Sequence, residues 1–136
     1  MGKYDNVTKR SARGWAWNRV CDRIIGTYNR RRSRVYVLIG DTTSEFETAI
    51  KKGFSPHNVI GVDIREEPVQ RWREAGGLAI QAPIEAVIAF SKVRPKAIIA
   101  DFCCGINDIS FRTFVLALRR TQTPGWGVMN LIKNRD

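Results

Sequence analysis

Three positions in the chain combine a residue type and a spacing that could serve chemistry. Gly40, Asp63 and Asp101 each directly follow a short run of aliphatic and β-branched residues. A carboxylate can accept hydrogen bonds from two ribose hydroxyls, and a glycine lets a ligand approach the backbone closely. If the apolar runs are parallel strands, their carboxyl ends meet at one edge of the sheet, where open α/β sheets bind ligands. The spacing therefore predicts a site for a nucleoside-containing ligand.

The stretches around these positions predict alternating strands and helices. Short apolar runs rich in β-branched residues are typical of buried strands, and amphipathic stretches that stop at glycine are typical of helices. We therefore expect an α/β, Rossmann-like core with a mainly parallel sheet of about five strands and flanking helices. The expected strands are 35–39, 59–62, 78–81, 97–100 and 128–132, and the expected helices are 45–52, 66–75, 83–91 and 107–120.

Residues 1–34 differ in charge from the core predicted over residues 35–136. They hold ten Lys/Arg and two Asp/Glu, so they supply +8 of the net charge of +10. Apolar residues recur at steps of three and four from Ser11 to Arg30, which predicts a basic N-terminal helix. A basic segment with aromatic residues favours contact with nucleic acid, the alternative being a solvated basic face. The candidate phosphate-binding residues are Arg13, Arg19, Arg23, Arg30, Arg31, Arg32 and Arg34.

Composition argues against several other classes of protein. The 136 residues suit one domain, and no apolar run reaches the length of about 18 residues that spans a membrane. Three cysteines, two of them adjacent, favour a reducing, cytoplasmic setting over a disulfide framework. With a single histidine, His57, and no Cys-x-x-Cys pair, we expect neither a metal site nor a Ser/His/Asp triad. Thr42 and Glu45 stand where a dinucleotide fingerprint would need glycines.

Three short motifs carry a resemblance to a known family. They are Val37-Leu38-Ile39-Gly40 with Glu45 and Ala49, then Asn58-Val59-Ile60-Gly61-Val62-Asp63-Ile64, and then Ile99-Ala100-Asp101-Phe102-Cys103. Through them, residues 33–133 resemble a class I S-adenosylmethionine-dependent methyltransferase, and especially the small phage-type methyltransferases. The resemblance implies S-adenosylmethionine as the cofactor without a metal, and a location in the host cytoplasm if the protein is phage-encoded.

The resemblance also implies roles for residues at the strand ends. Gly40 and its neighbour would border the methionine part of the cofactor. Asp63 would hold the ribose hydroxyls, and Ile64 would flank the adenine. Gln81 and Ala82, at the end of the third strand, would lie beside the adenine edge. The cofactor-binding residues so implied are Gly40, Asp41, Asp63, Ile64, Gln81 and Ala82.

Two catalytic residues are implied, Asp101 and Cys104. Asp101 would open the catalytic motif and accept a proton or bind an exocyclic amine, the alternative being a helix cap or a structural turn acid. The stretch Asp101-x-Cys103-Cys104 is similar to the Asp-x-Pro-Cys of some RNA cytosine methyltransferases, whose thiolate attacks carbon 6 of a pyrimidine. The alternative for both cysteines is that they are buried and inert.

Departures from the family pattern keep a second function open. Thr42–Ser44 replace further glycines in the first loop, Gln81-Ala82 replaces the usual Gly-Asp, and fewer strands are expected than the family's seven. We expect an S-adenosylmethionine-binding methyltransferase-like protein that acts on nucleic acid. The alternative is a non-catalytic methyltransferase-like fold that binds nucleic acid or a nucleoprotein partner through residues 9–34, or, more distantly, a virion or assembly component. A second copy or a partner subunit could supply the missing strands, and no membrane contact is expected.

Overall fold

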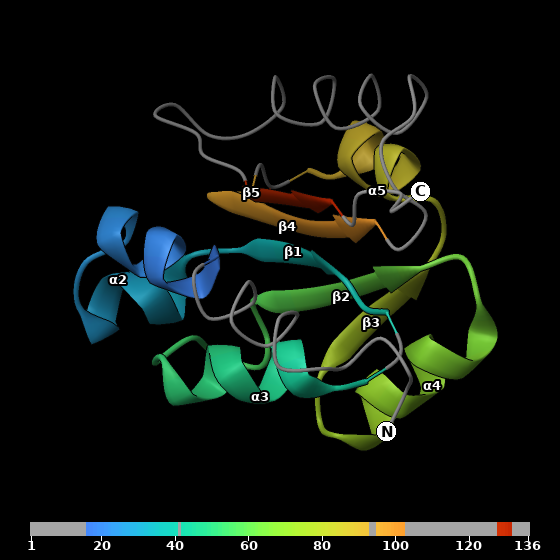
Figure 1. Cartoon of the computed structure of the whole chain (residues 1–136), viewed down its shortest axis with the longest axis horizontal. Helices are drawn as coiled ribbons and strands as arrows, with labels where there is room; N and C mark the ends of the chain where they lie inside the picture. Colours follow the sequence, from blue (N-terminus) through green and yellow to red (C-terminus); the bar gives the residue numbers. More distant parts are fainter. Residues whose placement is uncertain (1–15, 41, 93–94, 103–127, 132–136) are drawn as a thin grey trace, which may run out of the picture.

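The computed structural model describes residues 16–40, 42–92, 95–102 and 128–131. Helices and strands alternate along these residues, beginning with a helical stretch over residues 16–23 (Figure 1). The predicted α/β, Rossmann-like class is confirmed, while the helix predicted over residues 107–120 lies outside the described residues. The elements are α2 Thr27–Arg32, β1 Val35–Leu38, α3 Ser44–Lys51, β2 Val59–Asp63, α4 Glu66–Glu74, β3 Leu78–Gln81, α5 Ile84–Phe90, β4 Ala97–Phe102 and β5 Val128–Leu131.

The strands form a parallel sheet in the order β3-β2-β1-β4-β5. Val35 at the start of β1 pairs with Val59 of β2 and with Ala97 of β4, so these three strands begin level with one another. The chain runs outward from β1 through β2 to β3 and then returns to β4 on the other side of β1. The carboxyl ends of β1 and β4 therefore border the topological switch point, where open α/β sheets bind their ligands.

One face of the sheet is covered by α3, α4 and the helical stretch over residues 16–23 (Figure 1). Side chains of the central strands, such as Val37 and Val59, pack there in one cluster with the fully buried indoles of Trp17 and Trp72. Trp17 Nε1 also donates a hydrogen bond to Glu45 Oε1 at 3.4 Å. This bond joins the N-terminal helical stretch to the first turn of α3, so the stretch is part of the core.

The opposite face is covered by α5. Tyr36 and Ile60 point to this side and pack with Ile84 and Ile88. Successive residues of a strand face opposite sides of the sheet, so β1 and β2 are apolar on both faces, as is usual for central parallel strands. The edge strand β3 differs, because its Leu78 and Ile80 remain exposed.

Two glycines let α4 approach the sheet closely. A Cβ atom at Gly61 of β2 would lie 2.7 Å from the Trp72 ring, and one at Gly77 would lie 2.5 Å from it. Phe46 of α3 packs edge-on against the same ring, with centroids 5.3 Å apart. The indole therefore fills space that side chains would otherwise take, and it holds α4 against the strand that ends at Asp63.

Helices α3 and α4 end at glycines, as the sequence predicts. Gly53 and Gly76 have φ angles of +97° and +103°, in the left-handed region that favours glycine. In both cases the residue after the glycine donates its N–H to the carbonyl five residues earlier, at 3.1 Å. This is the Schellman arrangement, and it turns the chain from each helix into the next strand.

The prediction of one continuous basic helix up to Arg30 is wrong, because the helix is interrupted around Gly26. The first helical stretch ends at residue 23, Gly26 has a φ angle of +88°, and α2 begins at the next residue. Arg30 closes the break by donating from Nε to the Ile24 carbonyl at 2.8 Å and from Nη2 to the Cys21 carbonyl at 3.2 Å. Its Nη1 donates to the Lys52 carbonyl at 3.1 Å and so fastens α2 to the end of α3.

Candidate functional site

Gly40 and Asp63 stand on neighbouring strands, just past the end of β1 and at the end of β2. The Ile39 N–H donates to the Val62 carbonyl at 3.1 Å and holds the two strands together at this edge. Gly40 has a φ angle of +74°, and a Cβ built on it would meet no atom of the described residues within 4 Å, so among these residues the space beside it is open. Asp63 is only 9% exposed. The glycine and the carboxylate singled out in the sequence therefore lie at the same edge, one open and one buried.

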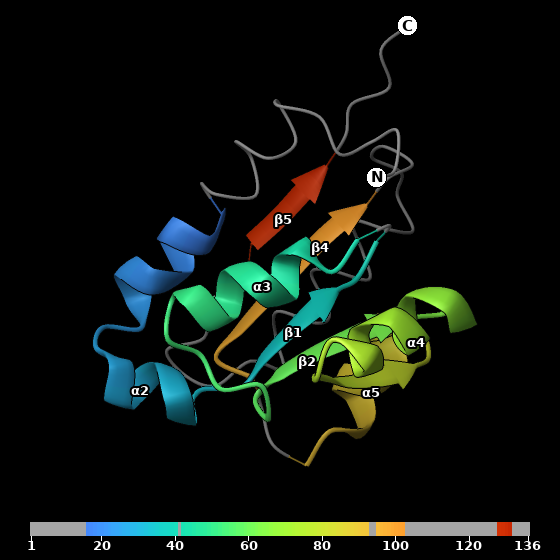
Figure 2. The ribbon, with the colours of Figure 1, turned by 90° about the horizontal axis from the view of Figure 1, so that it is seen from below.

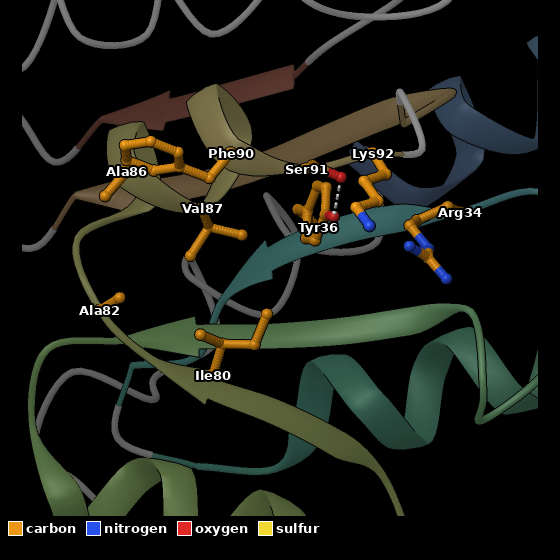
Figure 3. Close-up of a pocket in the computed structure, with 9 residues that line it drawn as sticks. All are labelled: Arg34, Tyr36, Ile80, Ala82, Ala86, Val87, Phe90, Ser91 and Lys92. Carbon is orange, nitrogen blue, oxygen red and sulfur yellow. Dashed lines mark hydrogen bonds between the residues drawn. The ribbon is translucent and has the colours of Figure 1, made fainter.

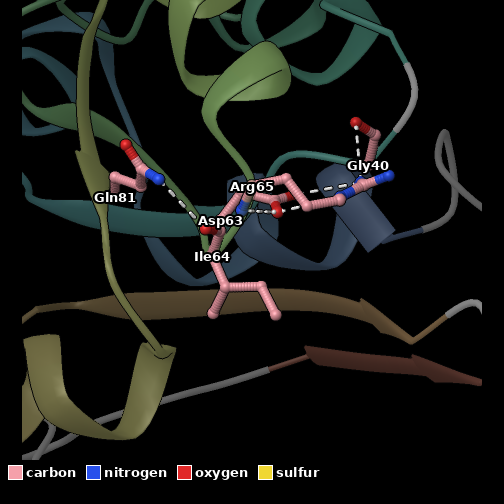
Figure 4. A network of polar contacts seen from close by, with 5 residues as sticks. All are labelled: Gly40, Asp63, Ile64, Arg65 and Gln81. Carbon is pink, nitrogen blue, oxygen red and sulfur yellow. Dashed lines mark hydrogen bonds and ion pairs between the residues drawn. The ribbon is translucent and has the colours of Figure 1, made fainter.

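The Asp63 carboxylate is held by Arg65 (Figure 4). Arg65 Nε donates to Oδ1 at 3.1 Å and Nη2 donates to Oδ2 at 3.1 Å, so the ion pair is bidentate. The backbone N–H of Arg65 also donates to Oδ1, at 2.9 Å. Nη2 lies 3.5 Å from the Gly40 carbonyl oxygen, so the guanidinium bridges the ends of β1 and β2. The Arg65 side chain is 55% exposed and thus covers the carboxylate from the solvent side.

The number of acceptor sites limits what else Asp63 can bind. A carboxylate offers about four lone-pair sites, two on each oxygen. Arg65 fills both sites on Oδ1 and one on Oδ2. A ribose diol that donates one hydrogen bond to each oxygen therefore finds Oδ1 already full. The diol and the Arg65 guanidinium are alternative partners of the same carboxylate.

Ile64, Gln81 and Ala82 continue the same edge toward β3. Ile64 is 66% exposed and projects from the end of β2 (Figure 4). Gln81 Nε2 donates to the Ile64 carbonyl at 3.3 Å, and the Ala82 N–H donates to the Asp63 carbonyl at 3.0 Å. These bonds keep the three residues next to Asp63. An exposed aliphatic side chain beside a carboxylate suits a flat base next to a sugar.

Asp101 belongs to β4, which is two residues longer than predicted. It pairs in the parallel ladder with Asn130 of β5. Because β4 also pairs in parallel with β1, its carboxyl end lies at the edge described above. Asp41, Cys103 and Cys104 lie outside the described residues, so their roles stay predictions.

The arginines of α2 lie away from this edge. Helix α2 leads into the amino end of β1, so Arg31 and Arg32 lie at the opposite edge of the sheet (Figure 2). Both are exposed, and the Arg32 guanidinium carbon lies 5.0 Å from the centroid of the Tyr28 ring, a cation–π contact. Arg30 differs from its neighbours, because its guanidinium donates to three backbone carbonyls.

The other candidate arginines are dispersed. Arg19 and Arg23 are exposed on the first helical stretch, and Arg19 pairs with Asp22 at 2.8 Å. Arg34 is half-buried just before β1, and Arg13 lies outside the described residues. The structure thus brings Arg31 and Arg32 together on one exposed surface and gives Arg30 a structural role.

Arg65 is the site residue that the sequence interpretation missed. The sequence indicated this role only through the position of Arg65, two residues after Asp63, which is close enough for a bidentate contact with the predicted ribose-binding carboxylate. Within the described ranges, no group of three or more His, Cys, Asp or Glu side chains is placed to hold a metal ion. No helix in the same part of the chain is long and apolar enough to cross a membrane.

Several solved structures share this fold, and two of them are described as rRNA methylases. An rRNA methylase from Streptococcus thermophilus superposes with a TM-score of 0.53 at 12% sequence identity, over 71% of this chain and 60% of that one. A protein assigned as an rRNA methylase, from Clostridium thermocellum, superposes with a TM-score of 0.53 at 11% identity, over 81% of this chain and 65% of that one. At such low identity the likeness establishes the fold. The chain shares the Rossmann-like α/β fold of these two structures.

The particular family within that fold class is not defined by sequence likeness. No protein-family model and no curated protein sequence matches the chain. The chain spans 60% and 65% of the lengths of the two structures that it resembles. Activity, substrate and partners are therefore argued from the site itself.

Proposed function

We propose that the chain binds S-adenosylmethionine and acts as a methyltransferase-like protein on nucleic acid. The observation that carries the proposal is the open glycine beside β1 next to the buried carboxylate that ends β2. Gly40 leaves room for the methionine part of the cofactor, and Asp63 offers its oxygens to the ribose. Ile64 offers an apolar surface to the adenine, whose edge meets Gln81 and Ala82.

The residues fit this cofactor once the Arg65 guanidinium leaves the carboxylate. Asp63 then keeps only the backbone N–H of Arg65 and has at least one acceptor site open on each oxygen, as a vicinal diol requires. The Arg65 side chain is more than half exposed, so water can solvate the guanidinium once it leaves the carboxylate. Cofactor binding therefore replaces one set of hydrogen bonds on Asp63 with another.

Bound S-adenosylmethionine supplies an electrophilic methyl group. In the proposal, Asp101 at the carboxyl end of β4 holds or deprotonates the acceptor group of the substrate. The place suits this role because β4 and β1 border the topological switch point. Cys104 keeps its predicted alternative role as a nucleophile toward a pyrimidine.

Nucleic acid is the proposed class of substrate. The net charge of +10 favours a phosphate backbone, and the exposed Arg31 and Arg32 next to Tyr28 combine cations with an aromatic ring, as single-strand binding requires. The two solved structures of the same fold are described as rRNA methylases, which supports RNA over DNA. The phage-type origin, the cytoplasmic location and a second subunit that completes the sheet stay predictions.

Isothermal titration with S-adenosylmethionine tests the binding step. Asp63→Ala should weaken binding by at least about tenfold, because a charged acceptor for two hydroxyls is removed. Glu74→Gln, at an exposed carboxylate that ends α4, should leave the affinity unchanged and is the matched control. Circular dichroism checks that both variants fold. Absence of binding to the wild-type protein would contradict the proposal.

Transfer of a labelled methyl group to RNA or DNA tests the catalytic step. We expect transfer to RNA by the wild-type protein, and a loss of about 100-fold in rate for Asp101→Ala with little change in cofactor affinity. Cofactor binding without transfer to either polymer would instead support the non-catalytic fold that acts through residues 9–34. That alternative predicts nucleic-acid binding that weakens steeply with salt and survives Asp63→Ala.

A further inference from the structure

A cavity of about 420 Å³ opens on the face of the sheet that α5 covers (Figure 3). It lies between β1, the edge strand β3 and α5, and its volume is that of a small-molecule site, for which about 300–1,000 Å³ is usual. Among the described residues, the lining contains two cations and no carboxylate. The lining residues are Arg34, Tyr36, Ile80, Ala82, Ala86, Val87, Phe90, Ser91 and Lys92.

One end of the cavity is apolar and partly open to solvent. Figure 3 shows Val87 of α5 and Ile80 of β3 on opposite sides of the cavity. Ile80 is 40% exposed, and Phe90, at the end of α5, is 86% exposed. Large apolar side chains with this exposure gain little from folding and can still bury surface against a ligand. A flat apolar group is the chemistry that this end would bind.

The other end of the cavity carries the cations. Arg34 precedes β1 and Lys92 follows α5, so both lie near the amino edge of the sheet. Arg34 Nε is buried, and no described residue accepts a hydrogen bond from it. Between the two ends, the hydroxyls of Tyr36 and Ser91 are hydrogen-bonded at 2.7 Å.

We propose that this cavity binds a nucleotide, with the phosphate at Arg34 and Lys92 and the base against Ile80 and Phe90. The positive charges of Arg34 and Lys92 attract a phosphate group, and a base can stack on the exposed aromatic ring. The inference rests on the proposed function, because it adds a site for the nucleic-acid substrate on the α5 face. A free mononucleotide and one nucleotide of a single strand offer the same chemistry to this cavity.

The position of the cavity explains how cations at the far edge can serve the proposed cofactor site. At the cationic end, Arg34 follows Arg32 of α2 by two residues, so a strand that extends past this end of the cavity would run toward α2. At the apolar end, Ala82 lines the cavity and donates its N–H to the Asp63 carbonyl at 3.0 Å. A single strand in the cavity therefore connects the basic helix to the edge that holds Asp63.

Binding of adenosine or uridine monophosphate, and of a short fluorescent single-stranded RNA, tests the inference on the full chain. Phe90→Ala should weaken binding by about 5- to 100-fold, the usual range for loss of a stacked aromatic ring. Because Phe90 is so exposed, this variant should fold normally, which thermal unfolding checks. Lys92→Gln should weaken binding by about three- to tenfold. Lys51→Gln, at an exposed lysine of α3 on the other face of the sheet, is the matched control.

Each outcome decides between the possible occupants. Weaker binding of both the mononucleotide and the RNA supports a nucleotide site, and weaker binding of the RNA alone identifies a single strand as the source. Unchanged affinity in both variants, or no binding of either probe by the wild-type protein, overturns the inference. So does concentration-dependent dimerisation that Phe90→Ala abolishes without any nucleotide binding, because the cavity would then be an interface between copies.

Titration of the wild-type protein with S-adenosylmethionine, run alongside, separates the two proposals. Nucleotide binding at this cavity without cofactor binding would contradict the proposed function and leave the cavity assignment intact. The opposite result is cofactor binding together with nucleotide affinities that Phe90→Ala and Lys92→Gln leave unchanged. That result would contradict the cavity assignment and leave the proposed function intact.

Discussion

The Arg65 guanidinium pairs with the Asp63 carboxylate through Nε and Nη2, each at 3.1 Å from its oxygen. In the proposed function this same carboxylate serves the ribose of the cofactor. Because the guanidinium and the ribose need the same acceptor sites, Arg65 competes with the ligand for Asp63. The ion pair is largely open to solvent on the Arg65 side, and such pairs contribute about 0–1 kcal/mol. The competition therefore adjusts the affinity without preventing binding.

Arg65→Ala should raise the affinity for S-adenosylmethionine by up to about fivefold, because the competing pair is lost while the backbone N–H of residue 65 remains on Asp63. Isothermal titration measures the change, and Arg71→Ala, at an exposed arginine of α4, is the matched control. The free energy of unfolding should change by less than about 1 kcal/mol. Weaker cofactor binding in Arg65→Ala would show that the guanidinium contacts the ligand, and competition would be the wrong explanation.

Arg30 and Arg31 are neighbours on α2 and should respond to substitution in different ways. Arg30→Gln should lower the free energy of unfolding by about 2 kcal/mol, because three backbone carbonyls lose a charged donor. Arg31→Gln should change it by less than about 0.5 kcal/mol, since its side chain is exposed. Urea unfolding measures both.

The same two variants test the nucleic-acid surface of α2. Arg31→Gln should reduce the slope of log affinity against log salt concentration by about one, as expected for the loss of one phosphate contact. Arg30→Gln should leave that slope unchanged, because its guanidinium is bound to the protein's own backbone. An unchanged slope in Arg31→Gln would remove this residue from the proposed interface.

Gly61 and Trp72 should be energetically coupled. Gly61→Ala places a Cβ atom 2.7 Å from the indole and should cost about 1–3 kcal/mol through overpacking. In the double variant with Trp72→Leu the indole no longer crowds the added methyl, and only the Cδ1 atom at the flexible end of Ile39, 2.9 Å away, must shift. The costs of the two single substitutions should therefore sum to at least about 1 kcal/mol more than the measured loss. A double-mutant cycle by chemical denaturation measures the coupling. Strictly additive costs would show that the indole does not limit the space at position 61.

Gly53→Ala should destabilise the fold by about 1 kcal/mol through the backbone alone. The φ angle at this residue is +97°, whereas the nearest atom that an added Cβ would meet is 3.6 Å away, so no clash contributes. Gly53→Asn should cost less, because asparagine tolerates the left-handed region better than alanine. Thermal unfolding of the two variants, side by side, checks the order. Equal losses would point to a cause other than φ.

The elements and their ends could be predicted because their causes are local. A strand alternates its side chains with a period of two, a helix repeats every 3.6 residues, and a glycine stops a helix in the left-handed conformation. These rules account for the stops at Gly53 and Gly76 and for the strands that lead to Gly40 and Asp63. Parallel pairing then follows from the alternation of strands and helices. The placement of Gly40 and Asp63 at one edge was therefore within reach of the sequence.

Which charges remain open to a ligand was decided only by the tertiary structure. Arg30 and Arg31 are alike in sequence, but the break at Gly26 turns one toward backbone carbonyls and leaves the other in solvent. Likewise, Arg65 occupies acceptor sites of the Asp63 carboxylate and also approaches the end of β1. Local periodicity sets the backbone conformation of each segment. The partners and exposure of a charged side chain depend on packing between residues far apart in the chain, such as the contact of Arg30 with the Lys52 carbonyl and that of Arg65 with the Gly40 carbonyl.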